Sequence, residues 1–140
     1  MPLDNNLAVV LMDVLLPGDG VFPVARDTEL AARIAAHGRF GPLLWPVLEC
    51  LPTGFLALDA DALVAAVEAV EAARPAAFAA LMTGVYSLYY THPAVAGVIA
   101  AQLGAPPGPP QPAGFALAPF DPAMLAIPAA RGPLYREVPE

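Results

Sequence analysis

A long span without charge constrains the fold of this chain more than any other feature of the sequence. From Pro75 to Phe120 there are 46 residues and no Asp, Glu, Lys or Arg, although the whole chain has only 140 residues. After folding, a chain of this size still exposes about a third of the surface of its unfolded state. Either the span forms the core while the rest of the chain wraps around it, or part of it is covered by something else. Because exposed apolar area beyond a few hundred Å² usually marks a binding surface, we favour a partner.

The composition is that of a folded, acidic and apolar protein of one domain. Hydrophobic residues make up 58% of the chain and charged residues 14%, which excludes a disordered chain. The net charge is −7, and all six basic residues are arginine. A nucleic-acid-binding protein needs a basic face to neutralise phosphates, so this composition argues against nucleic acid as a partner.

The sequence also bears on membranes and compartment. Its longest apolar stretches, Leu7–Leu16 and Pro75–Tyr90, are shorter than the roughly 20 residues that span a bilayer, so we expect no membrane insertion. The first residues lack the basic region of an export signal. We expect a cytoplasmic protein as the sequence stands, or a periplasmic one if a signal was removed or the chain is exported with a partner. Cys50, the only cysteine, excludes an intramolecular disulfide and leaves the redox compartment open.

Helical spacing of apolar residues, without a period-2 strand pattern, predicts an all-α fold. We expect a small orthogonal bundle of five to six helices over residues 1–104. An extended Pro-rich strap and carboxyl-terminal arm follow over residues 105–140, as part of the same single domain. The expected helices cover residues 7–16, 27–37, 43–51, 59–74, 75–90 and 93–103, with one further short helix at 121–126.

The pattern also assigns faces to individual side chains. The residues of the helix at 59–74 that are expected to face the core are Leu63, Val64, Val67 and Val70. The next helix carries a stripe of small residues that allows close approach of another backbone. This stripe consists of Ala76, Ala80, Gly84 and Ser87. Thr91 is expected to be the N-cap of the helix that follows.

Asp13 is an anomaly, because it is a carboxylate inside an apolar helix. Such a group needs a bonding partner, or it lies at the one edge of the helix that meets water. A solvent edge or a hydrogen bond to a loop amide is the ordinary explanation for it. A place in a ligand pocket is the alternative.

The residues give no assignment of a catalytic, cofactor-binding or metal-binding site. The two histidines and one cysteine do not pair at metal-ligand spacing, and no phosphate-binding or nucleophile motif is present. The richest polar cluster lies at a helix corner and consists of Tyr86, Tyr89, Tyr90 and His92. These side chains either contact a ligand or cofactor, or they are amphipathic rings at a buried corner whose hydroxyls bind carbonyls.

The arm combines proline-rich links, which form few backbone hydrogen bonds, with large apolar side chains. These apolar anchors are Phe115, Leu117, Phe120, Leu134 and Tyr135. Because such residues would be wasteful on a free tail, we expect the arm to lie on a surface, either its own or a partner's.

Motifs along nearly the whole chain resemble a known family. One motif is Leu-Leu-Pro-Gly-Asp-Gly at 15–20, followed by Phe-Pro at 22–23 and Ala25. Another begins with Ala-Phe-Ala-Ala-Leu at 77–81 and continues through Tyr-Tyr-Thr-His-Pro-Ala-Val at 89–95. A Pro/Gly-rich link then leads to Arg-Gly-Pro-Leu-Tyr-Arg at 131–136. In these motifs the chain resembles the small subunit (subunit 3) of gluconate 2-dehydrogenase and its relatives.

In that family the small subunit accompanies a large FAD-dependent oxidoreductase of the glucose-methanol-choline (GMC) type, often with a cytochrome. The resemblance implies a non-catalytic accessory subunit that binds and stabilises or matures such an enzyme, with FAD in the large partner and no cofactor in this chain. The expected partner contacts are Tyr86, Tyr89, Tyr90, His92, Phe115, Phe120, Leu134 and Tyr135. The chain departs from the family in lacking a twin-arginine signal and in carrying an expanded proline strap after Gly104.

Two other kinds of function stay open at the level of sequence. A free-standing small helical enzyme or ligand-binding protein would use the corner of Tyr86, Tyr90 and His92, together with Asp13. A homo-oligomer would cover its own apolar face with a second copy. Co-purification separates these cases, because they predict a large flavoprotein partner, an unaccompanied monomer and a symmetric oligomer, respectively.

Overall fold

A computed structural model describes residues 5–104 and 119–132 of the chain, and every regular element in these two ranges is helical. The all-α prediction is therefore confirmed. The chain divides into two compact units, Met1–Gly108 and Pro109–Glu140. That the arm belongs to the same domain as the bundle stays a prediction.

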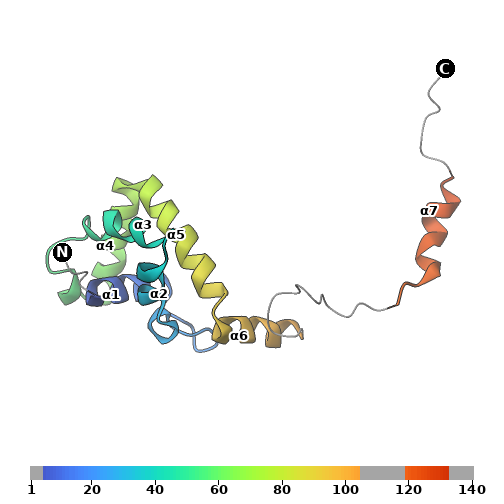
Figure 1. The fold of residues 1–140 in the computed structure, drawn as a ribbon, viewed down its shortest axis with the longest axis horizontal. Helices are drawn as coiled ribbons and strands as arrows, with labels where there is room; N and C mark the ends of the chain where they lie inside the picture. Colours follow the sequence, from blue (N-terminus) through green and yellow to red (C-terminus); the bar gives the residue numbers. More distant parts are fainter. Residues whose placement is uncertain (1–4, 105–118, 133–140) are drawn as a thin grey trace, which may run out of the picture. The chain divides into compact units, whose positions relative to one another are not determined.

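The described residues of the first unit, 5–104, form six α-helices and two short 3-10 helices, whose arrangement is drawn in Figure 1. The α-helices are α1 (Asn5–Leu15), α2 (Leu30–Ala36), α3 (Gly41–Leu48), α4 (Ala60–Ala73), α5 (Pro75–Tyr90) and α6 (Pro93–Leu103). The 3-10 helices are η1 (Ala25–Thr28) and η2 (Phe55–Ala57). None of the helices described is long and apolar enough to cross a bilayer.

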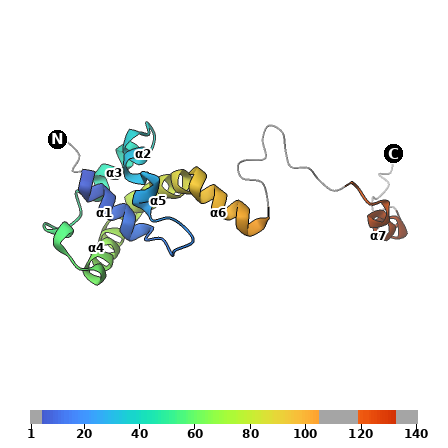
Figure 2. The ribbon, with the colours of Figure 1, turned by 90° about the horizontal axis from the view of Figure 1, so that it is seen from below.

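Helix α5 is the centre of this unit, because it contacts α2, α3, α4 and α6. Figure 2 shows α2 and α3 on one side of α5 and α4 on the other. Helix α1 packs against α2, α3 and α4. The core between these helices is apolar, and its fully buried side chains include Leu11, Met12, Leu30, Ile34, Leu44, Leu81 and Val85.

Most helix ends follow the signals in the sequence. Asp59 caps α4, where its Oδ1 accepts a hydrogen bond from the Ala62 N–H at 2.9 Å. Pro75 is the first residue of α5, and α6 ends at Gly104. The predicted cap of α6 is wrong by one residue, because His92 and not Thr91 is the N-cap. The Thr91 hydroxyl instead donates to the Ser87 carbonyl one turn back in α5, at 2.7 Å.

The predicted core face of α4 is correct for Val67 and Val70, which are buried, but wrong for Val64, which is 48% exposed. Leu63 is half-buried. The reason is geometric: successive residues of a helix are about 100° apart, and α4 packs against α1 and α5 along a narrower sector than its apolar residues span. Val64 therefore lies at the edge of that sector, beside a groove.

The predicted close approach along α5 occurs at Gly84. A Cβ added there would lie 2.8 Å from Cγ of Phe40, a residue that is only 7% exposed. The rest of the predicted small-residue stripe does not form one contact surface, because Ala76 and Ser87 are exposed to solvent. Gly84 thus fixes how closely the turn between α2 and α3 packs on α5.

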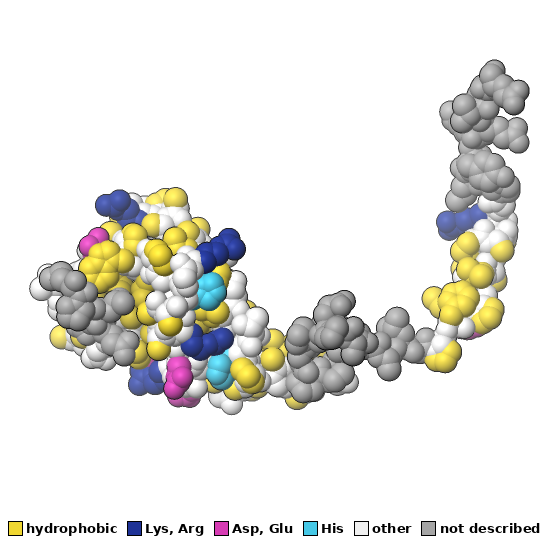
Figure 3. Space-filling model, in the orientation of Figure 1, with side chains coloured by type: hydrophobic (Ala, Val, Ile, Leu, Met, Phe, Trp, Pro, Cys, Tyr) yellow, Lys and Arg dark blue, Asp and Glu magenta, His cyan; other side chains and the backbone are white. Residues whose placement is uncertain are grey.

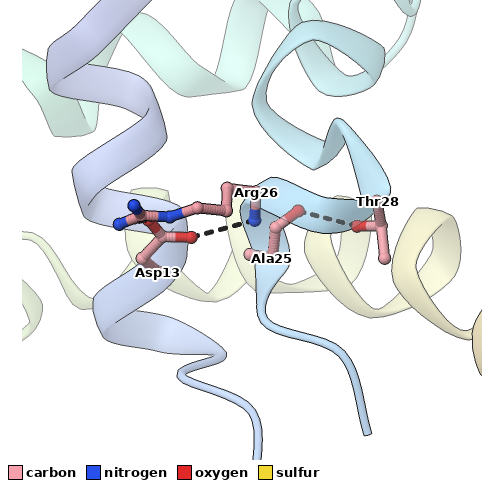
Figure 4. A network of polar contacts seen from close by, with 4 residues as sticks. All are labelled: Asp13, Ala25, Arg26 and Thr28. Atoms are coloured by element: carbon pink, nitrogen blue, oxygen red, sulfur yellow. Dashed lines mark hydrogen bonds and ion pairs between the residues drawn. The ribbon is translucent and has the colours of Figure 1, made fainter.

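Asp13 joins α1 to η1 (Figure 4). The Oδ1 atom of Asp13 accepts a hydrogen bond from the backbone N–H of Arg26 at 2.9 Å. The Oδ2 atom accepts a second hydrogen bond from Nε–H of the same arginine at 2.6 Å, and it also forms an ion pair with Nη2. The hydrogen bond that the Arg26 side chain donates to Asp13 raises the pKa of Arg26. In the same turn the buried Thr28 hydroxyl donates to the Ala25 carbonyl at 2.8 Å. The expectation of a bond to a loop amide is confirmed, and the carboxylate holds the loop after α1 in place.

The second unit is described only over residues 119–132. Asp121 caps η3 (Pro122–Leu125), which leads directly into α7 (Ala126–Ala130), so the predicted short helix is confirmed and extends to residue 130. Every described residue of this unit is exposed. Four of the predicted anchors lie outside the described residues, namely Phe115, Leu117, Leu134 and Tyr135.

Candidate functional site

The outer side of α5 is an uncharged surface that runs the length of the helix. Its inner side supplies Phe78, Leu81, Val85 and Tyr89 to the core. The exposed residues on the outer side, which we call the α5 face, are Ala76, Ala79, Thr83, Tyr86, Ser87 and Tyr90. A face of this kind, without charge and with two aromatic rings, has the composition of the centre of a protein interface.

The Thr83 and Ser87 hydroxyl groups of the α5 face are satisfied within the helix. Thr83 donates to the Ala79 carbonyl at 3.1 Å, and Ser87 donates to the Thr83 carbonyl at 2.6 Å. Both bonds run back by four residues, as Ser and Thr in helices commonly do. A partner that covers this face therefore leaves these donors paired, which keeps the cost of removing water low.

Tyr86 and Tyr90 are the exposed aromatic pair of this face, each 48% exposed. They lie one turn apart, with ring centroids separated by 6.1 Å. Tyrosine offers a large apolar ring with a polar tip and is enriched among the residues that dominate binding at interfaces. Of the predicted corner residues, these two are the ones a partner or ligand can reach most fully.

Tyr89 is the buried residue of the corner at the end of α5. It is only 3% exposed, and its hydroxyl donates to the Pro23 carbonyl at 2.6 Å. Burial raises the pKa of Tyr89, with smaller contributions from the charges of Tyr90 and Asp19. Its ring meets that of Tyr90 edge-on, with centroids 5.3 Å apart. Tyr89 therefore ties the end of α5 to the loop after α1 and positions Tyr90.

His92 is half-buried and serves as a helix cap. Its Nδ1 accepts the Ala94 N–H at 3.3 Å, which in a neutral ring places the proton on Nε2. The other histidine, His37, is used in a similar way, because its Nδ1 lies 3.2 Å from the Arg39 N–H and 3.3 Å from the Phe40 N–H. Each imidazole thus has one ring nitrogen engaged by the backbone.

The loop beside the corner is held by its own polar contacts. Asp19 Oδ1 accepts the N–H groups of Phe22, at 2.7 Å, and Val21, at 2.9 Å, and these bonds lower the pKa of Asp19. Gly18 has φ +73°, and a Cβ there would lie 2.9 Å from the Val24 nitrogen. Between this loop and the rings of Tyr89 and Tyr90 is a hollow of about 220 Å³. Pockets for drug-sized ligands occupy roughly 300–1,000 Å³, so the hollow is small for such a role.

A groove between α1, α4 and α5 was not anticipated from the sequence. It has a volume of about 300 Å³, and Glu68 and Glu71 contribute to its lining. Its apolar lining includes Val14, Leu15, Val64, Phe78, Met82 and Tyr86. The signal that could have revealed it is the wide apolar sector of α4, which exceeds what one contact surface can bury. We call this feature the α1/α4/α5 groove.

One crossing contact to α5 was also missed. The i, i+4 spacing of Glu29, Arg33 and His37 suggests one helix face, but Arg33 Nη1 donates to the Leu88 carbonyl of α5 at 2.8 Å.

Over the described ranges 5–104 and 119–132, no group of three or more His, Cys, Asp or Glu residues is arranged to hold a metal ion.

Comparison of the chain with protein-family models, curated proteins and solved structures gave no match. The resemblance to subunit 3 of gluconate 2-dehydrogenase therefore stays a prediction from the sequence motifs.

Proposed function

We propose that this chain is a non-catalytic accessory subunit that binds and stabilises or matures a large FAD-dependent oxidoreductase of the GMC type. The observation that carries the proposal is the α5 face, an uncharged surface along a 16-residue helix at the centre of the first unit. The core of a protein interface is depleted of charge and enriched in aromatic residues. Tyr86 and Tyr90 are the anchors of this surface.

The arm supports the same proposal. Phe120, Met124 and Ile127 are 64%, 70% and 69% exposed, and Leu125 is 52% exposed. Figure 3 shows hydrophobic side chains, in yellow, along the segment that carries α7. Met124 and Leu125 lie in η3, Ile127 lies in α7, and Phe120 precedes both helices. Exposed apolar side chains on a short helical segment are the anchors by which such a segment binds an apolar groove of another protein. The arm thus supplies a second contact, joined to the first through the chain itself.

The nature of the partner rests on the sequence resemblance. In that family the flavin belongs to the large subunit, so FAD is expected there and no cofactor is expected in this chain. Covering apolar area contributes about 25 cal/mol per Å², offset by the free energy lost when two molecules associate. Two linked contacts raise the effective affinity, because the second forms at a high local concentration.

The alternative is a free-standing ligand-binding protein that uses Tyr86, Tyr90 and His92. The neighbouring hollow of about 220 Å³ is small for it, and His92 Nδ1 already caps α6. Asp13, the other residue considered for such a pocket, is engaged by Arg26. These contacts favour the accessory subunit.

The proposal is tested by co-purification from the native source with a tagged chain. The wild type should elute with a flavin-carrying protein several times its own mass of 14.4 kDa. The double variant Tyr86→Asp/Tyr90→Asp should lose that protein. Trp45→Asp/Leu56→Asp is the matched control, because it places the same charges at apolar residues 38% and 43% exposed outside the α5 face. An unaccompanied wild-type monomer would support the alternative and overturn the proposal.

Deletion of residues 115–140 tests the contribution of the arm. The bundle should stay helical by circular dichroism, while the flavoprotein is lost or bound more weakly. If the deletion unfolds the bundle, the arm belongs to the core, and the interface must lie on the helices between Pro75 and Leu103.

A further inference from the structure

We propose that the protein surface that binds the α5 face carries an apolar patch with acidic side chains along one border and basic side chains along the opposite border. The acidic side chains meet Arg33 and Arg39, and the basic side chains meet Glu68 and Glu71. This inference rests on the proposed function, because it concerns the same α5 face. It adds the charge pattern of the partner's surface and the orientation in which that surface binds.

Basic residues border the α5 face on the side of α2 and of the turn that leads to α3. Arg33 of α2 reaches α5 directly, since its Nη1 donates to the Leu88 carbonyl at 2.8 Å. The exposed Arg39 has its guanidinium 5.5 Å from the centre of the Phe40 ring, and that ring packs on Gly84 of α5. Figure 3 shows arginine and histidine side chains, in dark blue and cyan, gathered over α2 and α5. We call Arg33 and Arg39 the basic border.

The basic border is continuous with the α5 face. The Thr91 hydroxyl donates to the Ser87 carbonyl at 2.7 Å, and it lies 3.3 Å from the Leu88 carbonyl that also accepts the bond from Arg33. Ser87 is one of the exposed residues of the α5 face. Thr91 therefore lies between that face and the basic border.

Acidic residues border the α5 face on the side of α4, which Figure 2 shows on the other side of α5 from α2 and α3. Glu68 and Glu71 are exposed and line the α1/α4/α5 groove, and Tyr86 of the α5 face lines the same groove. Arg74 follows in the turn between α4 and α5, outside the lining of the groove. Successive residues of a helix are about 100° apart, so Tyr86 and Ser87 lie toward opposite edges of the face. We call Glu68 and Glu71 the acidic border.

This separation of charge selects one orientation of the partner. Exposed ion pairs add little affinity, but complementary charges speed association, and like charges that meet across an interface are costly. A partner rotated by half a turn would place like charges together at both borders. A polyanion such as nucleic acid does not fit this pattern, because the acidic border repels it. The borders therefore fit a protein surface that carries charges of both signs.

The test measures binding of the flavoprotein from the native source to increasing amounts of tagged chain, quantified by the flavin retained. In about 0.1 M salt, where charges act over about 10 Å, Glu68→Arg/Glu71→Arg and Arg39→Glu should each weaken binding by at least about 10-fold. In about 1 M salt, where this range is about 3 Å, each should bind within about 3-fold of the wild type.

Matched controls separate the position of a charge from its sign. Asp27→Arg/Glu49→Arg makes the same change in net charge as Glu68→Arg/Glu71→Arg, at exposed residues outside the lining of the groove, and should bind as the wild type does. Arg39→Lys keeps the charge of the basic border and should also bind as the wild type does.

Reversing both borders in one chain gives the sharpest comparison, because the opposite changes partly cancel in net charge. The variant Glu68→Arg/Glu71→Arg/Arg39→Glu should bind most weakly of all, and circular dichroism checks that each variant is folded. If the wild type retains the flavoprotein and the border variants bind it equally well, or the controls weaken it equally, this inference is overturned while the proposed function stands. A wild type that retains no flavoprotein overturns both.

Discussion

Replacing Gly84 with alanine should destabilise the helical unit, although alanine is the better helix former by about 1 kcal/mol. The new Cβ would lie 2.8 Å from Cγ and 3.0 Å from Cβ of Phe40. The Phe40 ring has little room to move away, because it is 7% exposed and stacked on His37 at 4.5 Å. Overpacking of this kind costs about 1–3 kcal/mol, which outweighs the gain in helix propensity.

Gly97→Ala is the matched control for this substitution. Gly97 also lies inside a helix, α6, but a Cβ added there meets nothing within 4 Å, so only the gain in propensity remains. The two variants should therefore differ by about 1–3 kcal/mol in free energy of unfolding, with Gly97→Ala the more stable. For a unit of this size, each kcal/mol corresponds to about 4–8 °C in Tm.

Urea unfolding followed by circular dichroism measures this difference. If Gly84→Ala and Gly97→Ala raise the free energy of unfolding equally, the turn between α2 and α3 does not pack on α5 as described. Because that packing decides which side of α5 faces solvent, the result bears directly on the α5 face. The Phe40→Leu change in a Gly84→Ala background should recover part of the loss, since the two sites are in contact.

Three further predictions concern the polar contacts. Asp13→Ala should lower the free energy of unfolding, measured in urea, by about 1–2 kcal/mol, because the Arg26 N–H loses its acceptor. Arg26→Ala should lower it less than Asp13→Ala does, because the Arg26 side chain is 60% exposed. Tyr89→Phe should cost about 1 kcal/mol by the same assay, because the bond to Pro23 is lost from a buried ring, and an unchanged stability would contradict that contact. In the folded chain the pKa of Asp19 is lowered from its ordinary value of 3.8, so the stability that this shift contributes is present above pH 3.8 and is lost as the pH falls through the lowered pKa. Asp19→Asn should therefore lose less stability than the wild type between about pH 5 and pH 2. Parallel losses in the two proteins would count against the turn at Asp19.

The sequence predicts much of the fold, because helix ends in this chain depend on local chemistry. Asp59, Pro75 and Asp121 stand where the structure begins helices, and each signal acts within a few residues. The error at Thr91 is of the same local kind, since Thr91 and His92 are neighbours and both can cap a helix. The side chain that reaches the Ala94 N–H decides between them.

The surfaces could be predicted only in part, because they depend on contacts distant in sequence. The absence of charge from α5 is visible in the sequence, but which of its tyrosines is buried depends on Pro23, 66 residues away. The exposure of Val64 likewise depends on how α4 meets α1 and α5. Helical periodicity describes the faces of one helix and does not say how much of a face its neighbours cover.

The central claim is that the α5 face binds a large flavoprotein, and site-specific photo-crosslinking in the native source tests it most directly. A photoreactive residue at Ser87, exposed in the middle of the face, should give an adduct that mass spectrometry identifies as a flavin-carrying protein much larger than this chain. The same residue at Ala65, exposed on α4, should not give that adduct. No adduct from Ser87, or equal adducts from both positions, would contradict the account.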